Sequence, residues 1–352
     1  MLQKARIAVI GAGAVGMGTL DALLQREEIH GDVSCVAMAT RRPEDVGNQF
    51  SQEGINVPVV DHEGVKRMAG DIDVAVLADA SQRLLFQAPS WLKDFRSTVD
   101  SCDFHPNFGP YVDKEGVPQQ GYFRDMADAA EKYGRLASIG FGWDPGTEFS
   151  HKKIKGTSAF PGSVTNVFYG PGKSQGHTTA LKTPDMRELG VIDAIQFTMP
   201  NEETVKRALS GEMKEFPAGE RMWRNCYLLV NADADKERIA QTIREMPGYY
   251  AGYSRVEVNF VQKPELRKLQ EKVSHQGIII TTGKTRRGSS VVEQFTCKYE
   301  NNAEATGCLL AEAAISTARA YNAGQRGVII PGDDIRNLPS PLSREEIIQK
   351  GL

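Results

Sequence analysis

The sequence contains little cysteine. Five of its 352 residues are cysteine, they are scattered, and none forms a C-x-x-C pair. A disulfide framework needs an even set of closely spaced cysteines, so we expect free thiols in a reducing compartment and hence a cytoplasmic protein. The amino-terminal residues also lack the apolar stretch and small-residue cleavage site of a signal peptide.

Other absences exclude whole classes of function. No apolar run approaches the roughly 20 residues that cross a bilayer, so we expect no membrane partner. The six histidines form no H-x-x-x-H or H-E-x-x-H pair, so we expect no metal site. The sequence has no G-x-S-x-G hydrolase turn. A net charge of −3 without basic runs argues against a nucleic-acid partner.

The length predicts about two domains. In the first part of the chain, helical patterns alternate with short apolar runs at 6–10, 33–39, 73–77, 98–100 and 136–140. This alternation predicts an α/β domain with a Rossmann-like, doubly wound parallel sheet.

The pattern changes near residue 145, where longer strand-like stretches begin. They lie at 164–169, 195–199, 226–230, 254–261, 278–282 and 291–299. They predict an α+β domain, residues 146–302, on a largely antiparallel sheet whose exposed face serves a homodimer. Helical patterns return in 303–352, including a capping box at 343–346. We expect these helices to complete the first domain, residues 1–145.

A glycine-rich turn follows the first strand and opens a helical segment. Its residues are Gly11, Ala12, Gly13, Ala14, Val15 and Gly16. In such a turn the first glycine permits the sharp bend, the second lets a pyrophosphate approach, and the third allows close helix packing. The context predicts a dinucleotide site; the alternative is a glycine turn that binds nothing.

The end of the second strand favours NADP over NAD. NAD enzymes usually place an acidic residue there for the ribose hydroxyls, whereas this chain has Thr40, Arg41 and Arg42. A hydroxyl and guanidinium groups suit a 2′-phosphate through charge-assisted hydrogen bonds. The alternative is that both arginines are solvated surface charges.

Acidic and aromatic residues follow two later strands. Asp103 comes shortly after the strand at 98–100, and Trp143 and Asp144 follow the strand at 136–140. Ligands of open α/β sheets bind at the carboxyl ends of strands, so these residues are candidates for a substrate site. Taken alone, Asp144 before Pro-Gly could equally be a turn former.

Five segments resemble a known family. They read W-D-P-G (143–146), Y-G-P-G-K-S-Q-G-H (169–177), Q-F-T-M-P (196–200), R-V-E-V-N-F (255–260) and H-Q-G-I-I-I-T-T-G (275–283). In content and order they resemble meso-diaminopimelate dehydrogenase, and the resemblance extends over nearly the whole chain. The chain looks longer than typical members around 44–66 and 104–121.

The resemblance implies an activity and a set of site residues. The activity is reversible, NADP-dependent oxidative deamination at the D-centre of meso-2,6-diaminopimelate, giving L-2-amino-6-oxopimelate, ammonia and NADPH. Asp103 and Asp144 match carboxylates near the reacting amino group, and Trp143, Gln175 and Gly176 match contacts around it. The positions that match the group holding the distal L-centre are Thr198, Arg224, His275 and Asn301.

The chemistry of these residues fits a substrate with two carboxylates and two ammonium groups. Arg224 can bind a carboxylate through two parallel hydrogen bonds, although an arginine at this position could otherwise lie on the surface. Without the resemblance, His275, Thr198 and Asn301 would be read as structural residues. One of the two aspartates would accept the proton that the amine loses before hydride transfer, and the sequence does not choose between them.

One position departs from the family pattern. Thr179 stands where the family often has an aspartate near the substrate. Two alternatives therefore stay open: an NADP-dependent D-amino acid dehydrogenase of different or broader range, and an NADP-binding protein that has lost catalysis.

Overall fold

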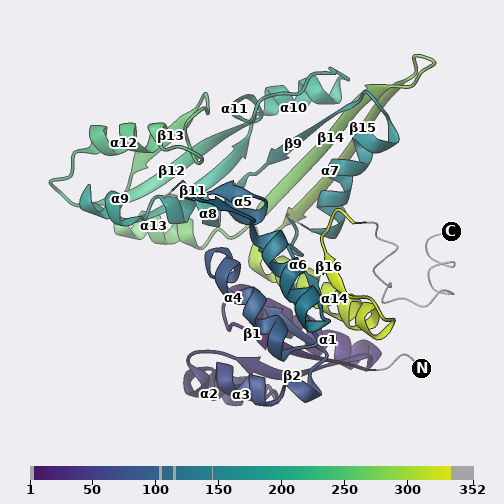
Figure 1. Ribbon diagram of the computed structural model, residues 1–352. Helices are drawn as coiled ribbons and strands as arrows, with labels where there is room; N and C mark the ends of the chain where they lie inside the picture. The colour runs from purple at the N-terminus through teal and green to yellow at the C-terminus, as the bar shows by residue number, and fades with distance from the viewer. Residues whose placement is uncertain (1–3, 103–104, 114–115, 145, 334–352) are drawn as a thin grey trace. The chain divides into compact units, whose positions relative to one another are not determined.

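The computed structural model describes residues 4–102, 105–113, 116–144 and 146–333 (Figure 1). The chain divides into two compact units, Met1–His151 with Ala303–Leu352, and Lys152–Asn302. Asp103 and the capping box expected at 343–346 lie outside the described residues. Within the described part of the chain, no helix is both long and apolar enough to span a membrane.

The first unit is built on a seven-stranded parallel sheet. Its strand order is β16-β8-β5-β4-β1-β2-β3. The strands are β1 (Ala5–Ile10), β2 (Val33–Ala39), β3 (Val59–Val60), β4 (Val74–Leu77), β5 (Ser97–Asp100), β8 (Leu136–Ser138) and β16 (Gly327–Ile329). This confirms the predicted doubly wound sheet, whose strand order reverses beside β1, the point where such folds bind ligands.

Helices cover both faces of this sheet because consecutive residues of its central strands are apolar, which makes both faces of each strand apolar. On β1, Ile7 and Val9 join a core that includes Leu20 and Leu310, while Ala8 and Ile10 face the other core. The helices are α1 (Ala14–His30), α2 (Pro43–Glu53), α3 (His62–Arg67), η1 (Ala69–Asp71), α4 (Ser81–Asp94), α6 (Tyr122–Tyr133) and α14 (Asn302–Asn322). Helices α1 and α14 pack on one face, and α4 and α6 on the other.

The expectation that 303–352 contributes only helices was incomplete. After α14 the chain adds β16 to the sheet, paired in parallel with β8. This strand has three residues, too few for a periodic signal in the sequence. The segment 104–121, around which the chain looks longer than typical family members, contains α5 (His105–Phe108) and a two-stranded pair, β6 (Tyr111–Val112) with β7 (Pro118–Gln119).

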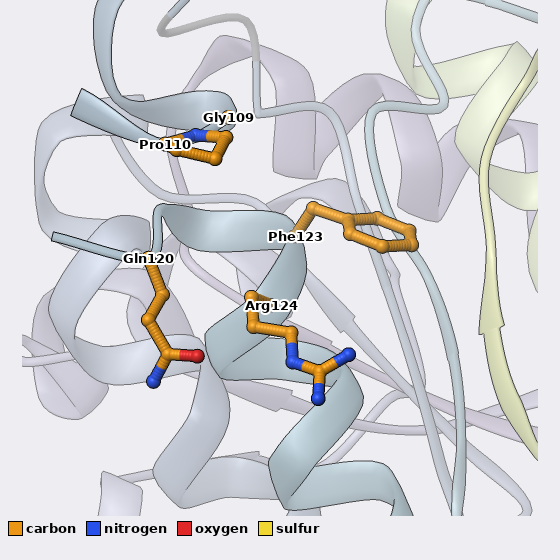
Figure 2. A pocket seen from close by; sticks show the side chains of 5 residues that line it. All are labelled: Gly109, Pro110, Gln120, Phe123 and Arg124. Carbon is orange, nitrogen blue, oxygen red and sulfur yellow. The ribbon is translucent and has the colours of Figure 1, made fainter.

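A pocket of about 550 Å³ lies where this segment meets the start of α6 (Figure 2). It is lined by Gly109, Pro110, Gln120, Phe123 and Arg124. None of these is a predicted site residue.

The second unit contains two sheets rather than the single sheet expected. One has the order β10-β11-β12-β13, and the other β15-β14-β9. Their strands are β9 (Val164–Tyr169), β10 (Gly172–Lys173), β11 (Val191–Pro200), β12 (Met222–Val230), β13 (Val256–Phe260), β14 (His275–Lys284) and β15 (Ser290–Tyr299). The chain passes from one sheet to the other at Gly170-Pro171. All pairs are antiparallel except β12 with β13, which is parallel.

Short helices flank these sheets, and α7 (Thr147–Ala159) leads into the unit. The others are α8 (Gln175–Ala180), α9 (Pro184–Glu188), α10 (Glu202–Leu209), α11 (Ala218–Arg221), α12 (Lys236–Glu245) and α13 (Lys263–Gln270). A core around Leu228, Ile239, Ile243 and Tyr250 joins α12 to the four-stranded sheet.

Candidate functional site

The three motif glycines of the turn after β1 play different parts. Gly11 has φ +113°, and a Cβ there would lie 2.4 Å from the Ala78 carbonyl oxygen. A Cβ on Gly16 would lie 1.8 Å from the Gly11 carbonyl oxygen. The fold itself therefore requires both. Around Gly13, by contrast, the described residues place no atom within 4 Å of a built Cβ. Gly13 leaves the backbone open on the side where a ligand would approach.

The start of α1 offers uncapped donors beside this open side. Gly13 is the N-cap residue and supplies no side-chain cap, and the first turn contains no acidic residue. The first N–H groups of a helix lack intrahelical acceptors and attract anions. Ala12, Ala14 and Val15 complete the turn, and an anion such as a phosphate group is the kind of ligand that donors of this sort attract.

Thr40, Arg41 and Arg42 lie between β2 and α2. Thr40 is buried, and its Oγ1 accepts a hydrogen bond from the Arg42 backbone N–H at 3.3 Å. Both arginine side chains are exposed. Burial alone would raise the pKa of the nearby Asp79 carboxyl, but hydrogen bonds from Arg83 and the charge of Arg41 lower it. Asp79 is thus an ionised carboxylate that pairs with Arg83. The guanidinium of Arg41 stays exposed to solvent.

Asp100, the last residue of β5, organises the loops after β5 and β8. Its side chain is fully buried, and its Oδ2 accepts from the Tyr122 hydroxyl at 2.6 Å. Its Oδ1 accepts from the backbone N–H groups of Cys102 at 2.9 Å and Gly140 at 3.1 Å. Burial raises the pKa of this carboxyl, and the three donors oppose the rise. Sequence reasoning missed the role of Asp100, because two of its three partners, Tyr122 and Gly140, come from distant segments.

The loop that Asp100 fixes after β8 carries two predicted site residues. Trp143 is buried and packs edge-on against Phe149, with ring centroids 5.2 Å apart. Asp144 follows it and is half-buried. A Cβ on Gly146 would lie 1.8 Å from the Gly142 carbonyl oxygen, so this turn needs glycine. Asp144 is therefore held on a tight turn at the carboxyl end of the sheet.

In the second unit, two predicted residues are direct neighbours across strands. Thr198 on β11 pairs with Arg224 on β12, and Gly172 on β10 pairs with Thr198 from the other side. Paired residues share a face of the sheet, and Arg224 Nη1 donates to Thr198 Oγ1. A Cβ on Gly172 would lie 2.5 Å from the His275 ring, so glycine at this point brings buried His275 against β10.

Arg224 is a buried cation without a buried counter-charge. It is 5% exposed, and it is the one buried lysine or arginine among the side chains that the structure describes. No carboxylate in the described ranges forms an ion pair with it, and its Nε has no hydrogen-bond partner there. Burial lowers the pKa of its guanidinium, which nevertheless stays charged. Such a group needs an anion.

The remaining predicted residues of this unit lie on α8 and after β15. Gln175 and Gly176 are the first two residues of α8, and both are exposed. Thr179 is exposed too, and its hydroxyl donates to the Gln175 carbonyl oxygen at 3.0 Å. Asn301 is half-buried and directly precedes α14.

Sequence reasoning also missed the aromatic residues around Arg224. Tyr253 stacks on the guanidinium, with Cζ 4.2 Å from the ring centroid. His177 packs edge-on against Tyr249 and Tyr250. Burial, with the charge of Arg224, lowers the pKa of His177 to about 3, so its ring is neutral. The sequence offered one sign of this cluster, His177, which stands in the S-Q-G-H segment.

A doubly wound parallel sheet with a glycine turn of this kind is typical of dinucleotide-binding oxidoreductases, and the buried arginine of the second unit would suit an anionic substrate. Residues 142–301 match the family model described as diaminopimelic acid dehydrogenase C-terminal domain. A meso-diaminopimelate D-dehydrogenase of Acetivibrio thermocellus is 32% identical over 352 residues, covering 98% of this chain and 97% of the relative. The chain belongs to the meso-diaminopimelate D-dehydrogenase family, which confirms the resemblance and makes it an oxidoreductase.

Solved structures agree with this placement. The structure described as C. glutamicum DAP dehydrogenase in complex with DAP matches with a TM-score of 0.83 and 28% identity, covering 100% of both chains. An engineered D-amino acid dehydrogenase bound to NADP⁺ matches with a TM-score of 0.80 and 26% identity, covering 99% of this chain and 100% of the other.

Proposed function

We propose that this chain catalyses NADP-dependent, reversible oxidative deamination at the D-centre of meso-2,6-diaminopimelate, releasing ammonia and L-2-amino-6-oxopimelate. The observation that carries the proposal is Arg224, a buried guanidinium whose Nε has no partner among the described residues. A substrate with a second carboxylate, remote from the reacting carbon, would supply the missing anion. A relative with 28% identity has been solved with DAP bound.

The first unit is proposed to bind NADP. The backbone from Gly11 to Gly16 would hold the pyrophosphate, and Thr40, Arg41 and Arg42 the 2′-phosphate. The open side of Gly13 and the uncapped start of α1 fit these groups. When bound, the nicotinamide ring supplies the hydride acceptor. One relative has been solved with NADP⁺.

The aspartates are proposed to manage the reacting amino group. Asp103 and Asp144 would hold the D-centre ammonium, and one of them would accept its proton so that the nitrogen lone pair can assist hydride departure. Trp143, Gln175 and Gly176 would shape the space around this centre. Asp100, by fixing the loop that carries Asp144, would act as a positioning residue for this chemistry.

The second unit is proposed to bind the distal L-centre and to form a homodimer. Arg224 would bind the distal carboxylate through two charge-assisted hydrogen bonds, which fixes orientation as well as affinity. Thr198, His275 and Asn301 would complete this part of the site. Sedimentation or light scattering would show whether the chain is dimeric.

One assay separates the candidate functions. NADPH absorbance is followed with meso-diaminopimelate, D-lysine and D-alanine as substrates. Turnover of the first alone supports the proposal. Turnover of all three supports a D-amino acid dehydrogenase of broader range. Thr179 favours this alternative, because it has a hydroxyl where the family often has a carboxylate. Silence with intact NADPH binding would identify a protein that has lost catalysis.

A further inference from the structure

The phenol of Tyr253 lies directly on the guanidinium of Arg224. Arg224 Nη2 donates a hydrogen bond to Tyr253 Oη, and the Tyr253 ring faces Cζ at 4.2 Å. The two residues come from different elements, since Arg224 is on β12 and Tyr253 is in the loop between α12 and β13. Stacking and hydrogen bonding together fix the phenol relative to the cation.

The loop that carries Tyr253 is anchored on both sides of it. Tyr250 is fully buried and its hydroxyl donates to the His177 carbonyl oxygen at 2.9 Å. Ser254 Oγ donates to the Gly219 carbonyl oxygen at 2.7 Å. The backbone N–H of Arg224 donates to the backbone carbonyl oxygen of Arg255 at 3.1 Å. Tyr253 is therefore pre-organised before any ligand arrives.

A count of donors shows what this arrangement offers. A guanidinium has five N–H donors, and the described residues accept two from Arg224, at Thr198 and Tyr253. Nε shares one edge of the planar group with Nη2, and Nε has no acceptor among these residues. The Tyr253 hydroxyl accepts from Nη2, and within the described chain its own proton has no acceptor. The Nε–H of Arg224 and the hydroxyl proton of Tyr253 thus both lack an acceptor among the described residues, and both lie at the Nε–Nη2 edge of the guanidinium.

We propose that Tyr253 is a specificity-determining residue, whose hydroxyl donates a hydrogen bond to the same substrate carboxylate that Arg224 binds. The inference rests on the proposed function and adds a second donor to it. One carboxylate oxygen would face Nε and the other the edge shared by Nη2 and the phenol. Arg224 supplies the charge, and Tyr253 favours a planar anion with two acceptor oxygens over a neutral or cationic end.

The experiment compares Tyr253→Phe with the unaltered enzyme. Steady-state kinetics are measured with meso-diaminopimelate, with NADP⁺, and with D-lysine as a substrate or competitive inhibitor, because D-lysine lacks the distal carboxylate. The variant keeps the stacked ring and loses only the hydroxyl. A hydrogen bond to a charged group is worth about tenfold or more in affinity. We expect the KM for meso-diaminopimelate to rise by that factor, with kcat and the constants for NADP⁺ and D-lysine within about twofold.

Tyr227→Phe is the matched control. Tyr227 lies three residues from Arg224 on β12 and so on the opposite face of the sheet, where its hydroxyl accepts from Asn225. This variant should leave every constant unchanged. An unchanged KM for meso-diaminopimelate in Tyr253→Phe, or an equal loss for D-lysine, would overturn the inference.

Arg224→Met separates this inference from the proposed function. If Arg224→Met impairs meso-diaminopimelate but spares D-lysine, the distal carboxylate site stands, and Tyr253→Phe alone decides the role of the phenol. If Arg224→Met impairs both substrates equally, the proposed distal site itself fails. Melting temperatures of all variants identify any loss that comes from unfolding.

Discussion

Substituting alanine at Gly13 or at Gly16 should separate ligand binding from folding within a single turn. Gly13 has φ −84° and ψ −178°, which any residue adopts, and a Cβ there meets no described atom within 4 Å. Gly13→Ala should therefore cost only about 1 kcal/mol or less, the usual effect of alanine at an N-cap. In Gly16→Ala the new Cβ would lie 1.8 Å from the Gly11 oxygen. Such overpacking should cost about 1–3 kcal/mol or more.

The assay is thermal unfolding with and without NADP⁺. A ligand present at about 100 times its Kd stabilises the folded state by about 2.7 kcal/mol. If the methyl group that Gly13→Ala adds blocks the approach of the pyrophosphate and weakens binding about tenfold, the same NADP⁺ concentration is only about 10 times Kd, and the stabilisation falls to about 1.4 kcal/mol. Gly13→Ala should thus show a near-normal Tm without cofactor and about half of the usual rise with it.

Gly16→Ala should give the opposite pattern, with a lower Tm in the absence of cofactor. A full cofactor-induced rise in Gly13→Ala would refute the view that a ligand occupies the open side of this glycine. An unchanged Tm for Gly16→Ala would show that the helix can shift away from Gly11, and that the structural reading of the third glycine is wrong.

Three further predictions concern single side chains. Arg41→Ala should raise the KM for NADP⁺ far more than that for NAD⁺ in parallel kinetic assays, and equal effects would refute a 2′-phosphate contact. Asp144→Ala should lower kcat/KM by about a hundredfold or more while the Kd for NADP⁺ stays within about twofold; weakened NADP⁺ binding would mean a structural role instead. The pKa of His177 is about 3 in the folded state and 6.5 in the unfolded state, so the folded state binds fewer protons between these pH values. The free energy of unfolding should therefore decrease as the pH is lowered below 6.5, by about 2 kcal/mol at pH 5 from this group. In denaturant titrations, His177→Gln should lack this part of the pH dependence.

Local features of the fold could be predicted from the sequence. The apolar run before Gly11 and the helical spacing after Gly16 lie within a few residues of each other, so one short window contained the strand, the turn and the helix. The same holds for Thr40 to Arg42, whose proposed function follows from residue type and position at the end of β2. The pattern change near residue 145 likewise indicated the second unit.

Long-range pairings could not be predicted. β16 has three residues and gains its strand conformation only from pairing with β8. The division of the second unit into two sheets depends on which strands meet, and the number of apolar runs does not determine this. No local pattern in the sequence marks Asp100 or Tyr253 as part of the site, because their partners Gly140 and Arg224 lie 40 and 29 residues away.

Three buried ionisable side chains of this chain differ in how the fold compensates their burial. Asp73 is 4% exposed, but Arg6 and Arg96 pair with it at 3.3 and 3.1 Å, so its charge is satisfied within the fold. Asp100 is compensated by three hydrogen-bond donors. Arg224, by contrast, has a buried donor, Nε, without an acceptor in the described chain; Arg135 and Arg221 share this feature, but only Arg224 is itself buried. Leaving such a cation unpaired costs several kcal/mol, a cost that a bound carboxylate removes. On the proposed function, the distal carboxylate of a dicarboxylic substrate would relieve this cost at Arg224, and a monocarboxylic substrate would not.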